Sequence, residues 1–219
     1  MTLVPIGFIF IFFVLAIIFL YFRKKKKIKF CREYGCSIIK DNKLKTSFID
    51  MLQDIAAFQR QSYTDINMYE MISLNFRGQN AYFAEVICIR GHGLNRKRED
   101  WHTFILESKE TLPYIKIVPN TNFINIITNK RLQFLRKPAN TDLGEIKIDE
   151  DYSLYCAPEY AQAVLDILPG ILSKIKEGKY IVEISGKWIV VMRWWSYTSF
   201  DKFIDQTLPI AKVFDEKRL

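Results

Sequence analysis

Residues 68–90, MYEMISLNFRGQNAYFAEVICIR, decide the fold class. Two runs rich in β-branched and aromatic residues flank the turn-like RGQN, a pattern typical of a β-hairpin. A third run, WHTFILES at 101–108, follows after GHGLNRKRED at 91–100. This order predicts a three-stranded antiparallel meander, and LPYIKIV at 112–118 could add a fourth strand, ended by Pro119.

The last third of the chain mixes strand and helix patterns. YSLYCA at 152–157 is typical of a strand, and Pro158 then begins a helix that we expect to reach about Lys176. Pro169 and Gly170 lie inside this pattern and should kink or split the helix. Gly178 is expected to stop it.

A second hairpin is expected after that helix. KYIVEIS and KWIVVMRWW flank Ser185 and Gly186, and Tyr180, Val182 and Ile184 alternate on one face of the first strand. Further on, apolar residues recur at helical spacing from Phe200 to Val213, so we expect a final helix capped by Ser199 and bent at Pro209.

The remaining soluble segments are less regular. Residues 47–60 should form a stalk or first helix, because Phe48, Leu52 and Ile55 recur at helical spacing. Residues 120–130 are ambiguous, RLQFLRK at 131–137 could be a short strand, and PANTDLGE favours a loop. We therefore expect one α+β domain over 61–219, with antiparallel sheet, meander plus C-terminal hairpin, and segregated helices.

The N-terminus has a different composition. Leu3 to Phe22 contains no charged residue, and a helix of twenty residues is about 30 Å long, enough to cross a bilayer. A buried core helix and a cleaved secretory signal are the alternatives. A helix apolar on all faces is unusual in a soluble domain, and a signal would have a basic start and a small-residue cleavage site. We expect a single transmembrane anchor over 1–22.

A basic juxtamembrane segment follows at 23–46. Its first ten residues carry seven positive charges and no acid, and without them the chain's net charge of +8 falls to +1. Basic residues beside a span stay on the cytoplasmic side, and aromatic residues favour the interface. We therefore place the N-terminus outside and residues 23–219 in the cytoplasm, at the cytoplasmic membrane. The expected interface residues are Tyr21, Phe22, Arg23, Lys24, Lys25, Lys26, Lys27, Lys29 and Arg32.

Several segments together resemble an uncharacterised family of bacterial membrane proteins. They are GHGLNRKRED, LPYIKIVPN at 112–120, IDEDYSLYCAPEYAQAVLDILPGIL at 148–172 and YIVEISGKWIVVM at 180–192. The resemblance covers roughly residues 65–215. It implies N-terminal transmembrane helix or helices with a cytoplasmic α+β domain, and it brings no established activity, cofactor or catalytic residue.

Motifs for chemistry are scarce. No Walker loop, GxSxG, HExxH or GxGxxG is present, so we expect no catalytic, cofactor or metal site, and enzymatic activity stays open with a leaning against it. Cys88 and His92 could supply two metal ligands, but a buried thiol and a solvated histidine are more usual. His102 is expected to be a partly buried strand residue. An acidic group could bind a cation or form a solvated loop; it consists of Glu145, Asp149, Glu150 and Asp151.

The four cysteines match no zinc ribbon, CxxC motif or disulfide scaffold, so we expect reduced thiols, with palmitoylation of Cys31 or Cys36 as a weak alternative. A basic turn, formed by Arg90, Arg96, Lys97 and Arg98, could contact lipid or a partner, or be balanced by Glu99 and Asp100. The favoured function is a membrane-tethered adaptor or scaffold with a protein partner. A sensor of anionic lipid headgroups and an enzyme without a recognisable motif are alternatives; nucleic-acid binding is not expected.

Overall fold

The computed structural model describes residues 4–33, 35–54, 65–76, 78–91, 96–120, 143–194 and 200–216. The chain divides into two compact units, Met1–Ser37 and Ile38–Leu219. The second unit holds nearly all of the sheet and the shorter helices, so it is the α+β domain.

The first unit is built on one helix. Helix α1 runs without interruption over Val4–Glu33, through both the apolar run and the basic residues that follow it. Two residues beyond its last residue, Gly35 adopts φ of +63°, a conformation that glycine reaches at little cost. The N–H of Cys36 donates to the carbonyl of Cys31 at 3.0 Å and so satisfies one of the last carbonyls of the helix.

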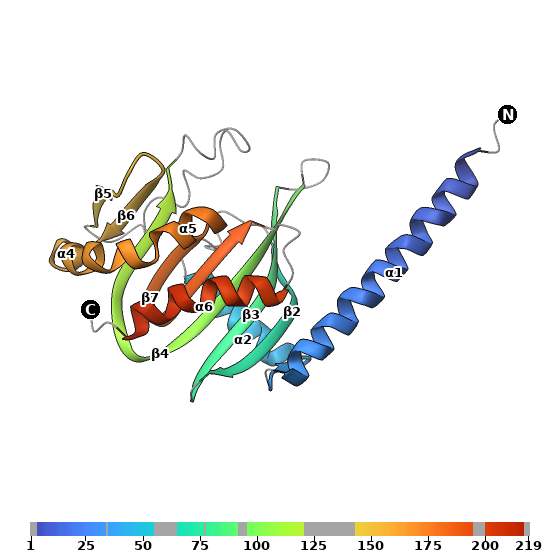
Figure 1. The fold of residues 1–219 in the computed structure, drawn as a ribbon, viewed down its shortest axis with the longest axis horizontal. Helices are drawn as coiled ribbons and strands as arrows, with labels where there is room; N and C mark the ends of the chain where they lie inside the picture. The colour runs from blue at the N-terminus through green and yellow to red at the C-terminus, as the bar shows by residue number, and fades with distance from the viewer. Residues whose placement is uncertain are drawn as a thin grey trace. The chain divides into compact units, whose positions relative to one another are not determined.

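The described part of the chain contains a seven-stranded sheet in the order β1-β2-β3-β4-β6-β5, with β7 paired to β4 (Figure 1). The pairs that join β2 through β7 are antiparallel. The expected α+β class with an antiparallel meander is therefore confirmed. The strands are β1 (Ser37–Ile38), β2 (Asp65–Phe76), β3 (Gln79–Arg90), β4 (Lys97–Pro119), β5 (Gly144–Lys147), β6 (Tyr152–Cys156) and β7 (Ile181–Trp194).

Strand β4 organises this sheet because it is long enough to bind three neighbours. Its first half pairs with β3, and its last residues, Ile115 to Pro119, pair with β6. Strand β7 pairs with β4 from Trp101 to Ile117. The expected fourth strand at 112–118 is therefore wrong as a separate element: it continues the third strand across irregular register between Glu107 and Ile115.

The expected C-terminal hairpin is also wrong. Residues on both sides of Ser185 and Gly186 belong to one strand, β7, and pair with β4 rather than with each other. Gly186 has φ of +59° and lies opposite Leu112, within the irregular stretch, so the glycine marks a local distortion instead of a turn. Both halves of β7 are buried, as expected of a strand inside a two-sided core.

The helices agree better with expectation. Helix α2 (Asn42–Asp54) begins earlier than the expected start at Ser47. The carboxylate of Asp41 accepts a hydrogen bond from the N–H of Lys43 at 2.8 Å and so caps the start of the helix. Residues 55–60 lie outside the described part. Helix α4 (Pro158–Ile167), the 3₁₀ turn η5 (Leu168–Gly170) and helix α5 (Leu172–Gly178) confirm the split at Pro169. Helix α6 (Phe200–Glu216) contains Pro209, as expected.

Two expectations at element ends need correction. Gly178 is the last residue of α5, and the left-handed residue that ends the helix is Lys179, with φ of 53°. Gly178 is needed for space instead, since a Cβ there would overlap the ring of Tyr180. The loop expected over PANTDLGE ends before Gly144, where β5 begins and pairs with β6; residues 138–142 lie outside the described part of the chain. RLQFLRK and Ser199 lie outside the described residues.

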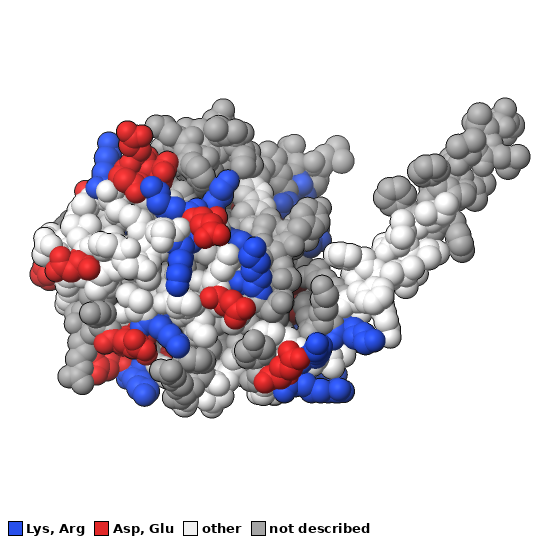
Figure 2. Space-filling model, viewed as in Figure 1, with Lys and Arg blue, Asp and Glu red and all other residues white. Residues whose placement is uncertain are grey.

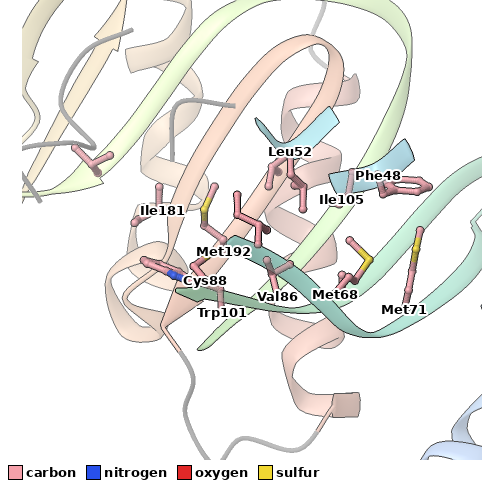
Figure 3. Packing of buried hydrophobic residues seen from close by; sticks show 14 of the residues in the cluster. Phe48, Leu52, Met68, Met71, Val86, Cys88, Trp101, Ile105, Ile181 and Met192 are labelled. Carbon is pink, nitrogen blue, oxygen red and sulfur yellow. The ribbon is translucent and has the colours of Figure 1, made fainter. Parts of the chain in front are cut away.

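The domain has helices on both faces of its sheet. Figure 1 shows α6 in front of the strands and α2 behind them. On the α6 face, the ring of Phe203 lies 5.5 Å from that of Phe83 and 5.8 Å from that of Tyr180. On the other face, Phe48 of α2 packs 4.3 Å from Tyr82 above a cluster that includes Met71, Val86 and Trp101 (Figure 3).

Candidate functional site

The most unusual surface of the described chain is the apolar stretch of α1. Its described side chains from Ile11 to Phe22 are exposed, for example Phe13 at 66% and Tyr21 at 61%. They are spread around the helix axis rather than gathered on one face. Protein surfaces rarely expose contiguous apolar area of this kind without a partner or a lipid phase.

Among the described residues, no helix combines the length and the mean hydropathy that a membrane span requires.

The basic residues of the first unit continue the same helix. Lys24, Lys25 and Arg32 are exposed, and Lys29 forms an ion pair with Glu33 at 3.6 Å. The side chains of Arg23, Lys26 and Lys27 lie outside the described set. Tyr21 and Phe22 lie edge to face, 5.9 Å apart, directly before this basic run. The structure therefore puts these residues in sequence along one helix, as an apolar and then a basic segment.

The basic turn is partly neutralised. Arg96 lies 3.9 Å from the carboxylate of Asp65, and Nε of Arg98 donates to Asp100 at 2.8 Å. Both arginine side chains are still more than half exposed. Arg90 pairs with Lys97 across β3 and β4, so the strands bring all four basic residues to one end of this hairpin. Of the two acidic residues expected to balance this turn, Asp100 pairs with Arg98, whereas Glu99 is buried.

Two residues of the acidic group form ion pairs with a lysine. Nζ of Lys176 lies 2.8 Å from Asp149 and 3.2 Å from Asp151, while Glu145 accepts a hydrogen bond from Ser153. Burial raises the pKa of Asp149, but bonds from Lys176 and from the N–H groups of residues 151 and 152 outweigh it and hold that pKa below its usual value. This loop is therefore held by a side chain of the protein itself.

A buried ion pair was missed by sequence analysis. Lys116 of β4 and Glu183 of β7 are paired on adjacent strands. Nζ of Lys116 lies 3.3 Å from Oε2 of Glu183, and both side chains are fully buried. The hydroxyl of Tyr114 donates to the second oxygen of Glu183 at 3.0 Å. Burial lowers the pKa of Lys116, an effect that the charge of Glu183 opposes. The signal was present: each charge stands alone inside an apolar run, in IKIV and IVEI.

A second set of polar residues lies beneath α6. His102 lies on strand β4 as expected, but it is buried rather than partly buried, with Nε2 3.7 Å from Glu85. Arg193, opposite His102 in register, stacks over the rings of Tyr180 and Phe203 at 5.5 and 5.1 Å. Burial lowers the pKa of Arg193. Cation–π contacts thus replace some of the hydration that the guanidinium loses.

These internal groups are part of the core and are shielded from a substrate. Cys88 is buried, and its expected partner His92 lies outside the described residues. In the described ranges no three His, Cys, Asp or Glu residues are placed to hold a metal ion. On the face in Figure 2, basic and acidic side chains of the domain are interspersed.

No protein-family model matches the chain, and no curated protein matches it. Among solved structures, the chain is similar to the crystal structure of the mycobacterial trehalose monomycolate transport factor A, TtfA. The TM-score is 0.58 at 11% sequence identity, and the likeness covers 89% of this chain and 93% of that one. At this identity the likeness shows the fold alone.

Proposed function

We propose that the chain is a membrane-anchored accessory protein whose α+β domain binds a protein partner at the cytoplasmic face of the membrane. One observation carries the proposal: the described apolar side chains of α1, from Ile11 to Phe22, are exposed on every side of the helix. Burial of such surface is favourable by about 25 cal/mol for each Å². An apolar phase is therefore the environment that suits it.

The anchoring part of the proposal rests on the sequence that surrounds this stretch. The uncharged run extends back to Leu3, which gives twenty residues, the length that crosses a hydrocarbon core. The helix then continues into the basic segment that ends at Arg32. Basic flanks are retained on the cytoplasmic side, so the domain would lie in the cytoplasm in a single-pass arrangement.

The accessory role is supported by fold and surface together. The similar structure is named a transport factor, and the likeness extends over most of both chains. The buried charges of this domain lie inside its core, so its exposed surfaces are what it offers to other molecules. We propose that it acts by holding another protein at the membrane, in line with the resemblance to bacterial membrane proteins with cytoplasmic α+β domains.

Cross-linking in intact cells tests this proposal. The full chain carries a photo-reactive residue in place of an exposed side chain such as Tyr69. The matched control is a fusion of residues 1–33 with an unrelated soluble domain. We expect the full chain to cross-link to a defined membrane-associated protein and the control not to do so. Identical products from both chains, or none from several exposed positions, would contradict the adaptor role.

Exposed arginines favour one second candidate, binding of anionic lipid headgroups. Arg96 and Arg98 project more than half of their side chains into solvent, although each already has an acidic neighbour. Binding of the full chain in nanodiscs to added anionic liposomes at low salt checks this, with Arg96→Gln/Arg98→Gln as the variant. Unchanged binding in the double variant excludes this turn as the lipid contact.

A further inference from the structure

The end of helix α1 has a specific backbone motif. After Glu33, Gly35 takes the left-handed conformation with φ of +63°, and the N–H of Cys36 returns to the carbonyl of Cys31 at 3.0 Å. This combination is the Schellman motif, in which the residue after the glycine bonds five residues back. Its geometry commonly brings the side chains of those two bonded residues into contact.

The same motif ends helix α5 and shows what those two positions usually hold. There Lys179 has φ of 53°, and the N–H of Tyr180 donates to Ile175 at 3.0 Å. Both Ile175 and Tyr180 are fully buried apolar side chains. In α1 the equivalent positions are two cysteines, and the thiol of Cys36 is hydrogen-bonded with Cys31.

We propose that Cys31 and Cys36 form a redox-active dithiol, which a peroxide oxidises to a disulfide within one chain. Both cysteines are partly exposed and free, so a small oxidant can reach them. Cys88 and Cys156 are buried in the domain and serve as internal references. The inference goes beyond the proposed adaptor function and does not depend on it.

The two sulfurs have different parts in this oxidation. Burial, together with the hydrogen bond and the charge of Cys31, raises the pKa of the Cys36 thiol to about 12, so Cys36 keeps its proton at neutral pH. The thiolate of Cys31 attacks the O–O bond of the peroxide, forms an S–O bond and becomes a sulfenic acid, while hydroxide leaves.

Disulfide formation completes the reaction. A neutral sulfenic acid at Cys31 no longer opposes loss of the Cys36 proton by its charge. The sulfur of Cys36 then attacks that of Cys31, the S–S bond forms, the S–O bond breaks, and water leaves with the proton of Cys36. In balance, two thiols lose two electrons and one hydrogen peroxide becomes two waters.

The test uses the full chain in its membrane or in detergent. Reduced protein is treated with hydrogen peroxide, quenched with N-ethylmaleimide, and digested with trypsin, which cuts after Lys29, Arg32 and Lys40. A disulfide then joins peptides 30–32 and 33–40, which otherwise separate. We expect this joined species from chains that remain monomeric on a non-reducing gel, with Cys88 and Cys156 still reduced. Separate alkylated peptides, or joining only between chains, would overturn the proposal.

Substitution of Gly35 tests whether the motif places the thiols. A Cβ at Gly35 would have open space, so Gly35→Ala changes only the backbone preference. We expect the rate of disulfide formation to fall about five- to thirty-fold, which corresponds to the cost of the left-handed region for an ordinary residue. Gly35→Asn should retain most of the rate, because asparagine visits that region more readily. Equal rates for glycine and alanine would overturn the geometric basis.

Variants that retain only one of the two cysteines distinguish the role of Cys31 from that of Cys36. In Cys36→Ser, the sulfenic acid of Cys31 should persist and react with dimedone. In Cys31→Ser, the hydrogen bond and charge of Cys31 are gone but burial still raises the pKa of Cys36, so Cys36 should give less adduct at neutral pH than Cys31 gives in Cys36→Ser, because thiolate is the reactive form. Stronger labelling of Cys36 than of Cys31 would contradict the assignment.

Discussion

Helices α1 and α6 are the two longest helices of the described chain, and they place apolar side chains in opposite ways. In α6, Phe203, Ile210 and Phe214 are fully buried on the side that contacts β4 and β7, whereas Lys202 is exposed. In α1, the described apolar side chains from Ile11 to Phe22 are all exposed. The sheet already provides an apolar environment for α6, and α1 requires a different one.

The charged side chains of the domain and of α1 also differ in their exposure. The domain encloses Lys116 and Glu183 in its core, where each neutralises the other and Tyr114 adds a hydrogen bond. The described lysines of α1 remain in solvent beyond its apolar stretch. The two regions are therefore expected to respond to different perturbations: membrane insertion should depend on α1, and unfolding of the domain on its core.

The largest expected effect comes from two charges in the apolar stretch. Leu15→Arg with Ile18→Arg should disfavour insertion by about 5–7 kcal/mol, twice the cost of one arginine at the centre of a span. The inserted fraction should fall, while the unfolding midpoint of the domain should stay unchanged. Leu15→Val with Ile18→Val is the matched control, and membrane flotation is the measurement. Equal flotation of both variants would contradict the claim that membrane insertion depends on the apolar stretch of α1.

The counterpart in α6 is Phe203→Ala. The ring contacts Phe83, Tyr180, His102 and Arg193, so its removal should lower the free energy of unfolding by about 3–5 kcal/mol. Insertion should not change. Urea unfolding followed by tryptophan fluorescence gives the value, and Lys202→Ala should shift it by less than about 0.5 kcal/mol. A loss below 1 kcal/mol would show that α6 is not packed as described.

The buried pair should show a loss that a second substitution reverses. Glu183→Ala leaves Lys116 without its counter-charge and should cost about 3–5 kcal/mol of unfolding free energy. Lys116→Met with Glu183→Leu removes both charges and should recover most of that loss. Denaturant unfolding of the three chains measures the difference. A double variant no more stable than Glu183→Ala alone would contradict the ion pair.

The smallest effect is expected at the surface bridge of Lys176. Because the pKa of Asp149 lies below its ordinary value in the folded state, its stabilisation is present above that ordinary value and is lost as the pH falls through the lowered one. Lys176→Met should therefore lower the unfolding midpoint slightly near neutral pH, and the difference from the parent should shrink in acid. A difference that grows below pH 4 would have the wrong sign.

Much of this fold could be predicted from the sequence, and the predictions that were wrong have definite physical causes. The meander, the break at Pro169 and the final helix follow from local periodicity, turn residues and proline, so they were predicted correctly. The C-terminal hairpin failed because Ser185 and Gly186 have the composition of a turn. Only pairing with the distant strand β4 reveals a distortion within one long strand.

The polar sites divide in the same way. The balance of Arg98 by Asp100 is local and was foreseen. The pair of Lys116 and Glu183 joins residues that are far apart in sequence, so a lone charge in each run signals burial without naming its partner. The contact of Cys31 with Cys36 is local, and CREYGC already contains the glycine that creates it, although the spacing matches no familiar cysteine motif.

Alkaline carbonate extraction of cell membranes tests the central claim, that α1 anchors the chain. The full chain should stay in the membrane pellet at high pH and be released only by detergent. A chain without residues 1–22, with its basic residues intact, should be found in the supernatant. Release of the full chain by carbonate, or retention of the shortened chain, would contradict the account.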